Sequence, residues 1–232
     1  MKASIDFHRH GHPDAQTCSM IRNLIFDLSE VLLPGIIGVE HRLSQELDLA
    51  PDAVTRAMGS RPHYQVGNRL DQLLDATIDY QQYRQEVLAD LGCDHPEGRE
   101  SFDHACLAMF DEPYPYASDL LAHLAPSYRL FLISDHCEYW VDHITSRHPF
   151  FSHFEAMIWS YAIGATKRQV DPFHRLLSRH QLIAEECLFI DDFAGNLATA
   201  QALGMQVFHF TGEPALPDLF RRLEAQPMPE AS

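Results

Sequence analysis

The sequence has 232 residues, with 46% hydrophobic and 22% charged side chains, which is typical of a folded globular protein. Its formal net charge at pH 7 is -16, with 33 acidic residues against 17 basic ones. Because nucleic acids and many membrane surfaces are also negatively charged, this balance argues against both as partners.

Residues 1 to about 20 are polar and rich in histidine, and they show no helical or strand periodicity. We expect a poorly ordered extension here. His8, His10 and His12 alternate and could bind a metal ion adventitiously, but a solvated tail is the expected state.

Four short apolar runs predict buried strands, because strands of a parallel sheet are covered on both faces. The runs are 24–26, 128–134, 187–191 and 206–210. Helical patterns lie between and after them, at 117–125, 137–147, 172–181, 194–203 and 215–225. This alternation predicts an α/β core domain with a Rossmann-like, doubly wound parallel sheet. We assign this core to residues 21–36 and 113–232.

Residues 37–112 lie between the first two predicted strands and contain no strand pattern. Helical patterns occur at 37–48, 52–59, 67–74, 77–91 and 97–109. An insertion of this size is too long for a loop. The sequence therefore predicts an inserted α-helical cap domain.

Polar side chains stand at the ends of the predicted strands, where open parallel sheets bind ligands. Asp27 follows the first strand, Ser134 ends the second, and Asp191 and Asp192 end the third. Lys167 follows a further short apolar segment, 158–162. Each of these residues alone could be a turn residue, a helix cap or a solvated charge. The acidic pair is harder to explain as a helix cap, because one strand directs both carboxylates toward one place.

Taken together, four segments resemble the motifs of the haloacid dehalogenase superfamily. They are FDLSEVL at Asp27, FLISD at Ser134, GATKR at Lys167, and DDFAGN at Asp191, in the order that this family shows. The resemblance extends from residue 22 to about 212, and the helical insertion matches the family's cap.

The resemblance implies a phosphatase that acts on a small phosphorylated metabolite. Asp27 would be the nucleophile and form an aspartyl-phosphate. Mg2+ would bind the Asp27 carboxylate, the backbone carbonyl of Ser29, and the pair Asp191 and Asp192. Ser134 and Lys167 would hold the phosphate.

Three positions depart from the family pattern. Ser29 stands where most of the family's phosphatases have a second aspartate, which serves as general acid and base. Glu30, His136 or a cap residue are candidates for that role. Asp135 replaces a common asparagine, and Arg168 replaces a common proline.

These departures leave two alternatives open. The first is a catalytically impaired member that binds a phosphorylated ligand or a protein partner. The second is a metal-independent 2-haloacid dehalogenase, which is disfavoured because the adjacent carboxylates Asp191 and Asp192 repel each other unless a cation intervenes.

Substrate contacts are predicted at His136, just after the second motif, and at His63 and Tyr64 in the cap. Tyr80, Tyr83 and Arg84 are further cap candidates, although the tyrosines have the spacing of core residues.

The five cysteines form no CxxC pair, which favours reduced thiols in a cytoplasmic protein. The N-terminus lacks a signal-peptide pattern, and no apolar run approaches the roughly 18 residues that span a bilayer. The sequence is compatible with a monomer or a homodimer.

Overall fold

The computed structural model describes residues 19–36, 38–60 and 62–224. Its centre is a sheet of five parallel strands in the order β3-β2-β1-β4-β5. The strands are β1 (Asn23–Phe26), β2 (Arg129–Ser134), β3 (Ala156–Trp159), β4 (Cys187–Asp191) and β5 (Gln206–His209). The predicted Rossmann-like α/β fold is confirmed. The histidine-rich N-terminal stretch lies outside the described residues, so its predicted disorder stays a prediction.

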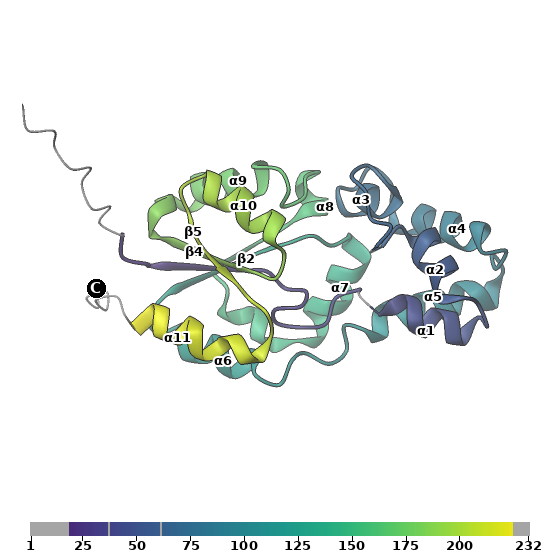
Figure 1. Cartoon of the computed structure of the whole chain (residues 1–232), viewed down its shortest axis with the longest axis horizontal. Coiled ribbons are helices and arrows are strands. Elements are labelled where there is room, and N and C mark those ends of the chain that lie inside the picture. Colours follow the sequence, from purple (N-terminus) through teal and green to yellow (C-terminus); the bar gives the residue numbers. More distant parts are fainter. Residues whose placement is uncertain (1–18, 37, 61, 225–232) are drawn as a thin grey trace, which may run out of the picture.

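Helices cover both faces of the sheet (Figure 1). One face carries α9 (Asp171–His180) and α10 (Ala194–Ala202), and the other carries α6 (Ala117–Leu124), α7 (Glu138–Arg147) and α11 (Leu216–Glu224). Short elements complete this part: α8 (Ser160–Ile163) and the 3-10 helices η1 (Pro149–His153), η2 (Ala184–Glu186) and η3 (Glu213–Ala215).

Successive residues of β1 pack into different cores, because side chains along a strand alternate between its faces. Leu24 and Phe26 belong to the larger cluster, which includes side chains of α6, α7 and α11. Ile25 belongs to the cluster that includes Phe173 of α9 and Leu197 of α10. All four residues of β1 are buried, which explains the apolar run from Leu24 to Phe26.

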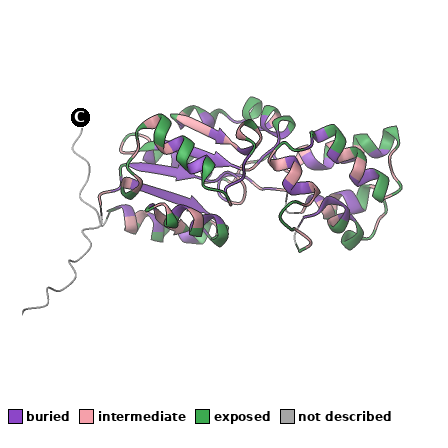
Figure 2. Ribbon diagram, turned by 90° about the horizontal axis from the view of Figure 1, so that it is seen from above, coloured by how far each residue is buried: buried purple, intermediate pink, exposed green. Residues whose placement is uncertain are grey.

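Five helices follow β1 and form the helical segment, residues 39–108. They are α1 (Val39–Glu46), α2 (Pro51–Met58), α3 (Arg69–Leu74), α4 (Tyr80–Asp90) and α5 (Pro96–Ala108). Figure 2 shows them gathered beyond one end of the sheet, with buried residues turned inward. Tyr83 and Phe102 are fully buried there, with their rings 6.1 Å apart. The Tyr83 hydroxyl also donates a hydrogen bond of 2.9 Å to the carbonyl of Met58.

The observed elements differ from the predicted ones at a few boundaries. The apolar segment 158–162 is not one element, since β3 ends at Trp159 and α8 begins at Ser160. None of the helices in the described residues is long and apolar enough to cross a membrane.

Candidate active site

Three carboxylates meet where β1 and β4 end. Phe26 pairs with Ile190 in the sheet, so Asp27 and Asp191 come level on neighbouring strands. Asp27 and Asp191 are buried, and Asp192 is half-buried. One oxygen from each of the three lies within 4.8 Å of the others. The strand register thus brings together residues that are 164 positions apart in the sequence (Asp191 against Asp27).

Lys167 lies against this carboxylate cluster. Its Nζ is 2.5 Å from Asp27 Oδ1 and 2.9 Å from Asp191 Oδ2, and its side chain is 3% exposed. The backbone reaches this position through Gly164, which ends α8 with a φ of 69°. The predicted grouping of the lysine with the acidic residues is therefore present in the structure.

Burial and charge act in opposite directions on these groups. Burial lowers the pKa of Lys167, but the charges of Asp191, Asp27 and Asp135 outweigh it and hold that pKa above its usual value. Burial also raises the pKa of the Asp27 carboxyl, and this effect exceeds the lowering by Lys167. A further cation beside the three carboxylates would favour the ionised form of Asp27.

Asp191 is held by groups that follow it in the chain. The backbone N–H of Phe193 donates to Asp191 Oδ1 at 2.7 Å. Asn196 Nδ2, in the first turn of α10, contacts both carboxylate oxygens at 3.2 and 3.1 Å. These donors satisfy oxygens that burial removes from water. The contacts of Asn196 give a structural reason for the asparagine at the end of the DDFAGN segment.

Ser134 stands beside the nucleophile candidate. Its hydroxyl lies 3.4 Å from Asp27 Oδ1 and 2.8 Å from His136 Nδ1. The other ring nitrogen of His136, Nε2, is 3.1 Å from the hydroxyl of Ser29. His136 therefore bridges two hydroxyl groups of the site, which the sequence alone does not reveal.

The turn after β1 gives Glu30 a structural role. Glu30 has a φ of 61°, and its carboxylate accepts hydrogen bonds from the Gly35 N–H at 2.9 Å and the Tyr114 hydroxyl at 2.8 Å. A Cβ at Gly35 would lie 2.9 Å from Cβ of Ser29, so only glycine fits there without a shift. Glu30 thus closes the turn that carries Ser29.

Asp135 supports the loop that carries Lys167. Its Oδ1 and Oδ2 lie 3.0 and 3.3 Å from the backbone N–H of Lys167. Burial raises the pKa of Asp135 to about 6, against the lowering effect of the Lys167 charge and N–H. Its carboxylate is therefore turned to the protein backbone, at a cost in stability when it ionises.

We expect Asp135→Asn to stabilise the protein at pH 8 and not at pH 4. Because the pKa of Asp135 is higher in the folded protein than in the unfolded chain, this carboxyl ionises first in the unfolded chain as the pH rises. The protein therefore loses stability between about pH 4 and pH 6. A rise of the Asp135 pKa from 3.8 to about 6 corresponds to about 3 kcal/mol, and the partial exposure of this side chain reduces the effect to about 1 to 2 kcal/mol. Urea unfolding of both proteins across this pH range measures the difference. An equal difference at both pH values would contradict the assignment.

A cavity of about 430 Å³ opens from the carboxylates toward the helical segment. Asp27, Ser29, Ser134, His136 and Lys167 line its inner end. Residues of the helical segment line the rest, including Glu40, His41, Thr55, Ser60, Tyr64 and Leu70. The cavity thus lies between the sheet and the helical segment.

The two cap residues predicted to contact substrate differ in position. Tyr64 lines the cavity. His63 is not among the lining residues, and its Nε2 lies 3.0 Å from Asp52 Oδ1 on the surface of α2. The structure therefore does not bring His63 to the site. Tyr80 and Tyr83 are buried in the helical segment, as their spacing suggested.

Arg168 connects the lysine loop with the helical segment. Its guanidinium carbon is 4.2 Å from the centre of the Tyr64 ring, and Nη2 lies 2.8 Å from Asp71 Oδ1. The arginine that replaces the family's proline thus makes a cation–π contact with Tyr64, which lines the same cavity, and an ion pair with Asp71.

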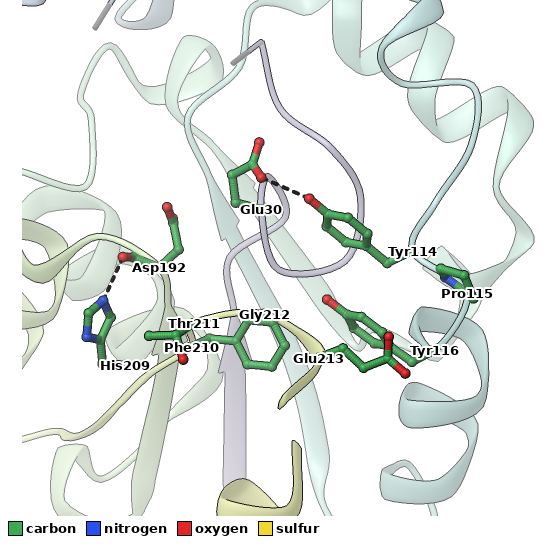
Figure 3. A pocket seen from close by; sticks show the side chains of 10 residues that line it. All are labelled: Glu30, Tyr114, Pro115, Tyr116, Asp192, His209, Phe210, Thr211, Gly212 and Glu213. Carbon is green, nitrogen blue, oxygen red and sulfur yellow. Dashed lines mark hydrogen bonds between the residues drawn. The ribbon is translucent and has the colours of Figure 1, made fainter. Parts of the chain in front are cut away.

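A second cavity of about 480 Å³ adjoins the first. Figure 3 shows the Glu30 carboxylate hydrogen-bonded to the Tyr114 hydroxyl, and His209 hydrogen-bonded to the backbone of Asp192. His209 Nε2 lies 2.9 Å from the carbonyl oxygen of Asp192. Glu30 and Asp192 line both cavities. The second cavity therefore borders the acidic end of the site.

The residues present fit a hard divalent cation. The three carboxylates supply oxygen ligands at short mutual distance, which is the donor chemistry that Mg2+ prefers. The ammonium of Lys167 is in ion-pair contact with two of the three carboxylates, Asp27 and Asp191, so a divalent cation beside the cluster would offset the negative charge that remains.

The fold and the site together are those of a hydrolase with a Rossmann-like parallel sheet. The family model of the haloacid dehalogenase-like hydrolases matches residues 21–204. The chain belongs to this family.

Similar proteins agree with this membership. A D-ribitol-5-phosphate phosphatase from Bacteroides thetaiotaomicron is 26% identical over 195 residues, which cover 82% of this chain and 91% of that protein. The structure of a predicted HAD-like family hydrolase from Porphyromonas gingivalis has a TM-score of 0.73 and 26% identity, covering 90% of this chain and all of that one.

A HAD family enzyme from Bacteroides thetaiotaomicron, in complex with magnesium and inorganic phosphate, has a TM-score of 0.71 at 20% identity. The alignment covers 87% of this chain and all of that one. At this identity the likeness shows a shared fold.

Proposed function

We propose that this protein is a Mg2+-dependent phosphatase that hydrolyses a small phosphorylated metabolite through an aspartyl-phosphate at Asp27. The observation that carries the proposal is the cluster of Asp27, Asp191 and Asp192, with Lys167 in ion-pair contact with the first two. The likeness to a D-ribitol-5-phosphate phosphatase supports the phosphatase assignment.

In this proposal Asp27, Asp192 and the backbone carbonyl of Ser29 would hold Mg2+, with Asp191 as a further ligand or as the partner of a metal-bound water. When bound, the ion would neutralise carboxylate charge and attract the phosphate oxygens. Ser29 lines the same cavity as Asp27 and Asp192, which is consistent with its predicted place in the ligand set.

The protein groups then act on the phosphate in two steps. One oxygen of Asp27 attacks phosphorus, the ester P–O bond breaks, and the alcohol leaves with a proton from solvent. Water next attacks the aspartyl-phosphate, which releases inorganic phosphate and restores the carboxylate. Lys167 and the Ser134 hydroxyl stabilise phosphate oxygens in both steps.

We further propose that residues 37–112 act as a cap domain over the core of residues 21–36 and 113–232. The cavity between them would enclose the organic part of the substrate and exclude water. Glu40, Thr55 and Ser60 line the cavity on the helical side and offer hydrogen-bonding groups. These groups suit hydroxyl-bearing substrates such as sugar or sugar-alcohol phosphates.

A second candidate function is the binding of a phosphorylated ligand without hydrolysis. Ser29 favours this candidate, because a serine hydroxyl cannot act as a general acid and base near neutral pH. The dehalogenase alternative is disfavoured by the acidic pair next to Asp27.

One assay separates these functions. Protein freed of metal with EDTA is offered p-nitrophenyl phosphate, then a panel of sugar and polyol phosphates, with and without added Mg2+. We expect turnover only with Mg2+, and no halide release from a 2-haloacid. Tight binding of a phosphate ester without turnover would favour the binding protein, and metal-independent halide release would favour the dehalogenase.

A further inference from the structure

Glu40 places a carboxylate in the wall of the active-site cavity. It stands in the first turn of α1, and Gly38 and Ser60, which hold its two carboxylate oxygens, line the same cavity. The Gly38 N–H donates to Oε2 at 2.9 Å, and the Ser60 hydroxyl donates to Oε1. A carboxylate has about four acceptor sites, so each oxygen keeps a site for a further donor. The carboxylate is therefore fixed in orientation and can still accept a hydrogen bond from a ligand.

The cationic side chains of the cavity are already engaged by the protein. Among the described residues, the lysine and arginine that line the cavity are Lys167 and Arg168. Lys167 belongs to the proposed phosphate site. Arg168 is ion-paired with Asp71 at 2.8 Å, and its guanidinium carbon lies 4.2 Å from the centre of the Tyr64 ring. A second negative charge on a ligand would therefore meet Glu40 without gaining a new cationic partner.

The remaining lining strengthens this discrimination by charge. Apolar side chains contribute to it, namely Ile36, Pro51, Leu70, Leu74 and Trp140. An anionic group that enters such a cavity loses hydration, and a carboxylate beside it then opposes binding. A hydroxyl group does not meet this repulsion, because it can donate a hydrogen bond to the carboxylate.

We propose that Glu40 is a specificity-determining residue, which accepts hydrogen bonds from hydroxyls of the substrate and rejects phosphate esters that carry a second anionic group. This inference rests on the proposed phosphatase function and narrows its substrate class to esters of uncharged, hydroxylated alcohols. Selectivity of this kind needs a repulsive element as well as an attractive one, and one carboxylate supplies both. Two other carboxylates of the lining serve the protein itself, since Glu30 closes the turn after β1 and Asp135 holds the lysine loop.

Three pairs of phosphate esters test the proposal, because the two members of each pair differ only in a terminal CH2OH or carboxylate. They are glycerol 3-phosphate with 3-phosphoglycerate, erythritol 4-phosphate with 4-phosphoerythronate, and ribitol 5-phosphate with 5-phosphoribonate. The ratio of kcat/KM within each pair is measured with Mg2+ at pH 8. Histidine side chains are ordinarily uncharged at this pH, which matters because His41 also lines the cavity.

We expect the wild type to prefer the polyol ester by roughly 10²-fold in the pair that it uses best, on the scale of a like-charge contact. Glu40→Gln keeps the shape of the side chain and should lower this preference at least tenfold on the same scale, chiefly because the acid becomes a better substrate. A wild-type preference below about threefold would overturn the proposal, since a like-charge contact costs more than that.

Two control variants separate the charge of Glu40 from its structural contacts. Glu46→Gln removes the same charge from the other end of α1, where Glu46 is ion-paired with His104 and does not line the cavity. Ser60→Ala removes a hydrogen bond to Glu40 and leaves its charge. Both variants should keep the preference of the wild type. An equal loss of preference in Glu46→Gln would assign it to the net charge of -16, and an equal loss in Ser60→Ala would assign it to the hydrogen bond, and either result would overturn the proposal.

Failure of this inference can be distinguished from failure of the proposed function. If the wild type hydrolyses none of the six esters, the proposed function fails, and calorimetric titration of each ester into the protein with Mg2+ still measures selectivity. Tighter binding of the polyol esters than of the acids, lost in Glu40→Gln, would then support the inference. Equal binding within each pair, or no binding of any polyol ester, would overturn it.

Discussion

Asp27→Asn is expected to lower kcat for phosphate-ester hydrolysis by roughly 10⁵- to 10⁶-fold, the scale on which loss of a catalytic nucleophile acts. An amide oxygen at position 27 cannot form the acyl phosphate. Its shape is otherwise preserved, and the Leu28 N–H, which donates to Asp27 Oδ1 at 2.6 Å, still finds an acceptor. Steady-state kinetics with Mg2+ measures the loss.

The stability of the Asp27→Asn variant separates lost chemistry from lost structure. Burial raises the pKa of Asp27 in the folded protein. Its ionisation therefore destabilises the folded state once the pH exceeds the pKa that this carboxyl has in the unfolded chain. At pH 7.5 the urea concentration at the midpoint of unfolding should therefore be at least as high for the variant as for the wild type. Asp119→Asn, on the exposed surface of α6, is the matched control and should keep full activity. Activity of Asp27→Asn within tenfold of the wild type would contradict a nucleophilic role.

Much of the site could be predicted because parallel strands end at a common edge. Asp27, Ser134 and Asp191 each follow or end an apolar run, and the sheet order places these three strands side by side. The place of Lys167 is harder to predict from the sequence, since it lies on a loop after α8 and its position depends on packing. Its contacts with Asp27 and Asp191 support the grouping that the family resemblance implied.

The sequence does not predict which neighbours a side chain contacts when it can point in several directions from the backbone. Neighbours in the sequence do not show that His63 faces Asp52 while Tyr64 faces the cavity. The bridge formed by His136 depends on the turn after β1, which brings Ser29 back over the end of β2. Glu30 in a left-handed conformation and the close approach at Gly35 build this turn, and neither has a clear signal in the sequence.

Lys167→Met should destabilise the protein as well as slow the proposed reaction. The ammonium is buried against Asp27 and Asp191, and its loss leaves two buried carboxylates without their cation. Removing one partner of a buried ion pair typically costs about 3 to 5 kcal/mol. Lys167 is also a proposed donor to the phosphate, so its loss should lower kcat by roughly 10²- to 10³-fold. This fall is measured at a temperature where the variant remains folded.

The pH dependence of this variant identifies the cause of its instability. Without Lys167 the folded pKa of Asp27 rises further, so the stability loss appears as the pH increases above about 4 and shrinks when Asp27 is protonated. Added Mg2+ should restore part of the stability at pH 8, because the proposed metal site is assembled only in the folded protein. Lys167→Arg is the control that keeps the charge, and it should retain more stability than Lys167→Met. A loss that is independent of pH and unaffected by Mg2+ would show that Lys167 acts through packing alone.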